Sequence, residues 1–171
     1  MGLDMYAHTL HANLVPRGQA TDVNITELAL QAVGFTRISA EDRSTLMNEE
    51  AVKKYWADEN KALSLATELG VYNHNFAYWR KFNALHGWMQ GLYDSKGGTS
   101  KEFNCNNVRI ESEDLDLLEE TVKSQALKPV SGFFFGGETI NEEDIEDLQA
   151  FIAKARQAIA LNQAVFYDSW W

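Results

Sequence analysis

One stretch of the chain collects the residue types most able to do chemistry: NFAYWRKFNALHGWM, residues 75–89. Its periodicity predicts a helix over residues 76–93, on which Arg80, Asn83 and His86 follow one another at intervals of three and project from adjacent rows. A guanidinium offers a planar fork to a carboxylate or phosphate, and an imidazole can carry a proton near neutral pH. The stretch therefore predicts a small polar site. A helix that buries these groups against the fold is the competing interpretation.

Three further residues complete the predicted ligand-binding site. Trp79 lies in the same polar stripe of the predicted helix as Asn83 and His86. Asp4 and Tyr6 belong to the amino-terminal segment, and we expect them to lie beside the helix. The sequence shows no complete catalytic constellation, so the catalytic residues remain unassigned and we expect no cofactor.

Other reactive side chains give weaker signals. His8 and His11 fall on a predicted strand and its exit, with no cysteine or acidic cluster to complete a metal site. Cys105, the single cysteine, could act as a nucleophile with His86 as its base, but nothing in the sequence brings the two together. A lone buried cysteine is the commoner case. We therefore predict no metal site and a structural role for Cys105.

Composition and charge restrict the class of protein. The chain has 171 residues, of which 45% are hydrophobic and 23% charged, as in a globular domain. Its formal net charge of -10 repels nucleic acid phosphates and anionic membranes. No apolar run approaches the roughly twenty residues that span a bilayer, and a single cysteine fits a reducing compartment. We expect a cytoplasmic protein that binds neither nucleic acid directly nor membranes.

Hydrophobic periodicity predicts the elements that must position the site. Strands are predicted over residues 2–10, 102–110, 131–138 and 164–171. Helices are predicted over residues 25–32, 47–69, 76–93, 112–122 and 141–159. This order predicts a single α+β domain over residues 1–171, with a small, mostly antiparallel sheet of three to four strands and four to five helices packed mainly on one face. Residues 15–70 are predicted to form a helical insertion, because the predicted strands lie outside them.

Five motifs together resemble those of a known family. They are MGLDMY, YWRKFNALHGWM, FNCNNV, SGFFFG and FYDSWW. The set is similar to a family of small uncharacterised proteins of bacteria and their phages, over the first ten residues and most of residues 76–171. Some relatives carry a phosphoglycerate kinase label, but this chain is too short for a two-domain kinase and has no nucleotide-binding loop. The resemblance implies that the group of Trp79, Arg80, Asn83 and His86 belongs to the family pattern, without implying a ligand.

Three functions are compatible with these observations. The leading hypothesis is a soluble, non-enzymatic accessory protein of bacterial or phage origin that binds a protein or a small ligand. The first alternative is a small enzyme on a phosphate- or carboxylate-bearing metabolite, with Arg80 holding the anion and His86 acting as acid or base. The second is an acidic DNA mimic that inhibits a host nucleic-acid-binding protein, with carboxylates of residues 111–120 and 138–147 on one face. The terminal tryptophans also favour a homodimer.

Overall fold

The computed structural model describes residues 2–44, 49–129 and 139–171. In chain order, its elements are β1 (Asp4–His11), a short 3-10 turn (Ala12–Leu14), α1 (Ile25–Ala32), α2 (Ala40–Ser44), α3 (Glu49–Glu68), β2 (Tyr72–Arg80), α4 (Asn83–Ser95), β3 (Asn107–Ile110), α5 (Ser112–Lys123), α6 (Glu142–Ala160) and β4 (Gln163–Trp170).

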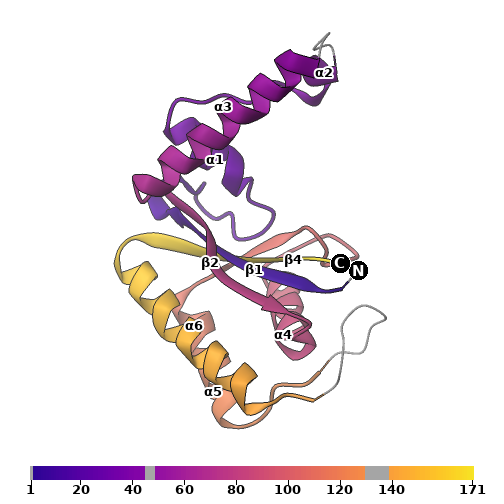
Figure 1. Cartoon of the computed structure of the whole chain (residues 1–171). Coiled ribbons are helices and arrows are strands. Elements are labelled where there is room, and N and C mark those ends of the chain that lie inside the picture. The colour runs from indigo at the N-terminus through magenta and orange to yellow at the C-terminus, as the bar shows by residue number, and fades with distance from the viewer. Residues whose placement is uncertain (1, 45–48, 130–138) are drawn as a thin grey trace.

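One antiparallel sheet, with strand order β2-β1-β4-β3, runs through the middle of the molecule (Figure 1). The two central strands are the first and last elements of the chain. They pair from Asp4 opposite Trp170 to His11 opposite Gln163. The start of β1 and the end of β4 therefore lie side by side (Figure 1). The predicted α+β class, with its small antiparallel sheet, is confirmed.

The larger hydrophobic core lies between one face of the sheet and helices α4, α5 and α6 (Figure 1). Met5, Trp79 and Tyr167 contribute from the sheet, and Leu118 and Ile152 contribute from the helices. Side chains on a strand alternate between its two faces, so residues next to Met5 in sequence point to the opposite side. Full burial of an apolar side chain such as that of Met5 or Leu118 stabilises the fold by about 1.5–3 kcal/mol.

A smaller core lies on the opposite face, at one end of the sheet. There Leu10 and Phe166 pack with Ala29 of α1 and Ala66 of α3. The described part of the chain thus contains six α-helices. Of these, α4 to α6 lie along one face, and α1 and α3 pack against one end of the other. The rest of that second face, toward the start of β1, stays accessible to solvent.

The predicted helix over residues 76–93 is wrong in its first part. Residues Tyr72–Arg80 form β2, which pairs with β1, and α4 begins only at Asn83. Between them Lys81 adopts a φ of 58°, a left-handed conformation that reverses the chain. The strand thus begins four residues before the predicted helix, at Tyr72.

A shift in strand register explains the error. The buried residues of β2 are Tyr72, Phe76 and Trp79, at spacings of four and three that imitate a helix. The pairing of β1 with β2 shifts between Ala7 and Thr9, which breaks the two-residue alternation of a regular strand. Aromatic residues such as these favour strands, but that preference is weaker evidence than periodicity.

The other elements follow the predictions more closely, except that the strand predicted over residues 102–110 is formed only by Asn107–Ile110. Helix α1 begins and ends at the predicted residues, and the Asn24 side chain caps it. Capping boxes start α5, with Glu111 and Asp114, and α6, with Asn141 and Asp144. The strand predicted over residues 131–138 lies outside the described residues.

Residues 15–70 contain α1, α2 and α3, and the four strands of the described sheet lie outside them. An isolated bridge joins Thr21 to Val108 of β3. Whether this region is an insertion stays a prediction. None of the described helices is long and apolar enough to cross a bilayer.

Candidate functional site

The structure divides the predicted site between the two faces of the sheet. Trp79 points into the larger core, and Asn83 and His86 of α4 are buried there, with 3% and 1% of their surface exposed. Arg80 follows Trp79 on a strand rather than a helix, so it points to the opposite face. The expected row of Arg80, Asn83 and His86 is therefore wrong, because it depended on a continuous helix.

His86 is part of the core packing. Its Nδ1 lies 3.0 Å from the hydroxyl of Tyr167, and its ring stacks on that of Phe103, with centroids 5.5 Å apart. Burial lowers the pKa of His86 to about 4, so the imidazole is neutral at physiological pH. The competing interpretation, in which the fold buries these polar groups, therefore applies to His86. Arg80 and His86 lie on opposite sides of the sheet, and the geometry gives no support to an enzyme that uses both.

The other predicted residues, Asp4, Tyr6 and Arg80, come together with three that sequence reasoning missed. Strand pairing sets them in two neighbouring rows, since paired residues of an antiparallel sheet project to the same face. One row is Arg80, Asp4 and Trp170, and the next is Tyr78, Tyr6 and Asp168. We call these six residues the open face.

Asp4 organises one side of the open face. The hydroxyl of Tyr78 donates a hydrogen bond of 2.6 Å to Oδ1 of Asp4, and Nε of Arg80 lies 3.6 Å from the same oxygen. The ring of Tyr6 tilts against that of Tyr78, with centroids 5.3 Å apart. Tyr78 and Trp170 are 55% and 52% exposed, and the Arg80 side chain is 62% exposed. Two aromatic rings and a guanidinium are thus presented to solvent.

The open face carries two carboxylates, of Asp4 and Asp168, and one cation, that of Arg80. Burial raises the pKa of the Tyr6 phenol, and the nearby charges of Asp4 and Asp168 raise this pKa further. The pKa of Tyr78 is raised chiefly by its hydrogen bond to the Asp4 carboxylate and next by burial. Both shifts have the sign expected where negative charge opposes ionisation of a phenol.

A cavity of about 270 Å3 borders the open face, between the sheet and the start of α1. Asp168 belongs to both. Nε2 of His8 donates a hydrogen bond of 3.0 Å to Oδ2 of Asp168. The polar residues along the cavity wall include His8, Thr26, Tyr72, Cys105, Asn107 and Asp168.

Asn107 fixes this wall in place. Its Oδ1 accepts a hydrogen bond of 3.0 Å from the backbone N–H of Val23, and its Nδ2 donates one of 2.8 Å to the carbonyl oxygen of Val23. The side chain therefore holds the segment before α1 against β3. The sole cysteine, Cys105, is exposed beside the cavity, so the expectation of a buried cysteine is wrong.

The residues that sequence reasoning missed left only faint signals. Asp4, Tyr6 and His8 alternate along one strand, and Asp168 and Trp170 are two apart on another. The terminal tryptophans, which the sequence linked to a homodimer, lie apart: Trp170 is half exposed on the open face, and Trp171 packs against the larger core.

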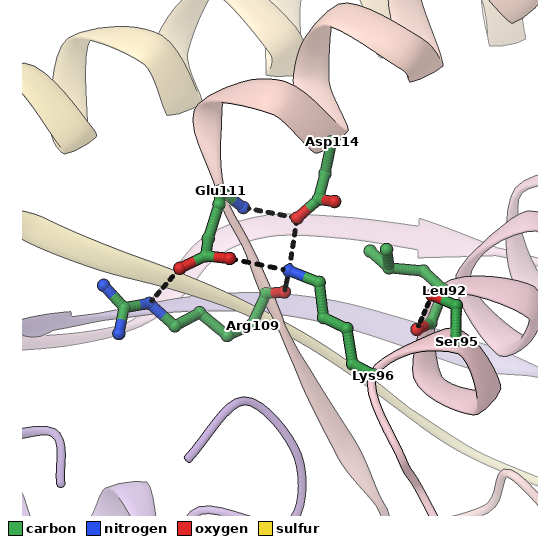
Figure 2. A network of polar contacts seen from close by, with 6 residues as sticks. All are labelled: Leu92, Ser95, Lys96, Arg109, Glu111 and Asp114. Atoms are coloured by element: carbon green, nitrogen blue, oxygen red, sulfur yellow. Dashed lines mark hydrogen bonds and ion pairs between the residues drawn. The ribbon is translucent and has the colours of Figure 1, made fainter. Parts of the chain in front are cut away.

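The acidic residues at the start of α5 lie in ion pairs. Figure 2 shows Lys96, at the end of α4, reaching the carboxylates of Glu111 and Asp114 and donating to the carbonyl oxygen of Arg109. Farther along α5, Asp116 and Glu119 pair with Arg156 of α6, with N–O distances of 2.5 and 2.7 Å. Four carboxylates over residues 111–120 are thus paired with cations, whereas the DNA-mimic alternative also depends on those over residues 138–147 and stays a prediction.

Within the described ranges, no group of three or more His, Cys, Asp or Glu side chains is placed to hold a metal ion. Searches of family models, curated proteins and solved structures found no match to this chain.

Proposed function

We propose that this protein acts by binding a partner protein through the open face. The observation that carries the proposal is the placement of Tyr78, Arg80 and Trp170, all more than half exposed, in two adjacent rows of one sheet. Trp, Tyr and Arg are the residue types enriched among those that dominate binding energy at protein interfaces. Isolated exposed apolar residues need no explanation, but a cluster of these three types does.

The charge on the protein specifies the partner further. The net charge is -10, and Asp4 and Asp168 make the open face locally negative. Complementary charge speeds encounter and suppresses wrong partners. We therefore take the partner to present a basic surface. The resemblance of five sequence motifs to those of bacterial and phage proteins is the basis on which we propose an accessory role in the bacterial cytoplasm.

A capture experiment tests this proposal. Immobilised protein is exposed to bacterial lysate, and captured proteins are compared between the wild type, the double variant Tyr78→Ala/Trp170→Ala and the control Leu117→Ala. Leu117 is 58% exposed on α5, which packs against the other face of the sheet. The candidate partner is then purified, and its Kd is measured for each variant at two salt concentrations.

We expect the double variant to weaken binding about tenfold or more, equivalent to about 1.4 kcal/mol. Leu117→Ala should leave the Kd unchanged, and added salt should weaken the wild-type complex. A purified partner that binds the double variant as tightly as the wild type would refute the role of the open face.

A further inference from the structure

The cavity beside the open face has the chemistry of a pocket for a cationic side chain. Asp168 supplies the charge. Its Oδ2 accepts the hydrogen bond from His8, while its Oδ1 accepts none from the residues that the structure describes. The carboxylate is 29% exposed, so its free oxygen remains within reach of a second donor.

The rest of the wall is mainly polar. Asn24, Thr26, Asn107 and Cys105 line the cavity, whereas the neighbouring Val23 and Ile25 are themselves buried in the smaller core. Tyr72 also lines it, and its ring stacks on that of His8, with centroids 6.5 Å apart. Lysine and arginine cations carry several N–H donors, so a polar wall can hold such a head group by hydrogen bonds.

The start of α1 also borders the cavity, and its helix dipole is positive there. Two features of the first turn offset that charge. The Asn24 side chain accepts a hydrogen bond from the backbone N–H of Glu27, and Glu27 itself brings a carboxylate into the turn. Glu27 is in turn 4.0 Å from the Arg37 guanidinium. Asp168, which pairs with His8, is the one carboxylate among the described residues that line the cavity.

We propose that this cavity receives an arginine or lysine side chain of the protein that docks on the open face. The inference rests on the proposed function and names the group that the partner inserts. The open face supplies the exposed aromatic surface. The cavity supplies the carboxylate that binds the inserted side chain, and the hydrogen bonds between Asn107 and Val23 hold its wall in place before binding. A preformed pocket lowers the ordering cost of binding.

Cys105 provides a direct test, because it is the only cysteine and it lines the cavity. The rate at which iodoacetamide alkylates Cys105 is measured in the folded protein while N-acetyl-arginine N-methylamide is added. The corresponding citrulline derivative, which has the same shape without the charge, is the matched probe. The glutamate derivative serves as an acidic probe. Two variants, Asp168→Asn and Asp147→Asn, are compared with the wild type, and circular dichroism confirms that each is folded.

The arginine probe should slow alkylation in a saturable way, about tenfold at ten times its Kd, as mass action requires for a blocked thiol. The citrulline probe should protect at least about tenfold less effectively. Asp168→Asn should remove this preference. Asp147→Asn, which deletes an exposed carboxylate on α6, should retain it.

Equal protection by the arginine and citrulline probes, protection by the glutamate probe, or no protection by any probe would overturn the proposal. The comparison of probes in the wild-type protein holds even if Asp168→Asn fails to fold. This experiment needs no partner, so it tests the cavity separately from the open face. It can fail while Tyr78 and Trp170 still prove essential for partner binding. It can also succeed while variants of Tyr78 and Trp170 leave partner binding unchanged.

Discussion

Burial decides what individual side chains of this protein can do. His86 looks reactive in the sequence, but the structure packs it against Phe103 and Tyr167, and burial keeps it neutral. Arg80, a few residues earlier, is largely exposed and lies beside Asp4. Both belong to one predicted helix in the sequence. In the structure, His86 lies on α4, beneath one face of the sheet, and Arg80 ends β2 and points to the other face.

The low pKa of His86 predicts a loss of stability in acid. An unfolded histidine takes up a proton below a pH of about 6.5, whereas folded His86 resists protonation down to about 4. Between these values the unfolded state binds more protons. The free energy of unfolding therefore falls as the pH falls, by roughly 3 kcal/mol in total from this group. Urea unfolding at pH 7 and pH 4.5 measures the loss.

His86→Gln is the control for that experiment, since it removes the titrating group and keeps a polar side chain. The variant is expected to be less stable than the wild type at pH 7 and to lose less stability on acidification. Parallel pH profiles for the two proteins would show that His86 does not titrate as its burial implies.

At the level of elements, sequence periodicity succeeded where helices have regular faces and clear ends. Helix α1 is matched at both ends, and Gly34, with a φ of 80°, follows its last turn. The capping box of Asn141 and Asp144 marks the start of α6. Such signals are local, so they can be recognised without knowledge of the fold.

Strand β2 shows where the same reasoning fails. Its buried residues repeat at helical spacing because its pairing with β1 shifts register, and no local signal reveals a shift that depends on the partner strand. The error also misplaced the site. Three of the six predicted residues, Asp4, Tyr6 and Arg80, do lie together, but on a sheet rather than beside a helix.

The junction between α4 and α5 depends on Lys96, which is only 14% exposed (Figure 2). Replacement by methionine leaves the partly buried Asp114 without its cationic partner. We expect Lys96→Met to lower the free energy of unfolding by about 2–3 kcal/mol. Thermal and urea unfolding measure the change.

Lys53→Met is the matched control, because Lys53 forms an exposed ion pair with Glu49 on α3. Exposed pairs of this kind contribute little, so the control should unfold like the wild type. If the two variants were equally stable, the network around Lys96 would not hold α4 against α5.

At the scale of the whole molecule, the open face joins the two ends of the chain with a strand from its middle. Asp4, Arg80 and Asp168 are neighbours only because β1 lies between β2 and β4. Composition predicted an acidic protein that binds neither nucleic acid directly nor membranes, and the aromatic and polar residues of 75–89 suggested a binding role. The place of the proposed binding surface depends on strand order and register, which one sequence does not specify.

Site-specific photo-cross-linking tests the central claim most directly. The photoreactive residue p-benzoylphenylalanine replaces either Trp170 on the open face or Leu117 on α5, both more than half exposed. After irradiation of bacterial cells, position 170 should give a discrete adduct with a basic protein, and the Tyr78→Ala/Arg80→Ala background should reduce it. Adducts at position 117 but none at 170, or an adduct at 170 unaffected by that background, would contradict the account.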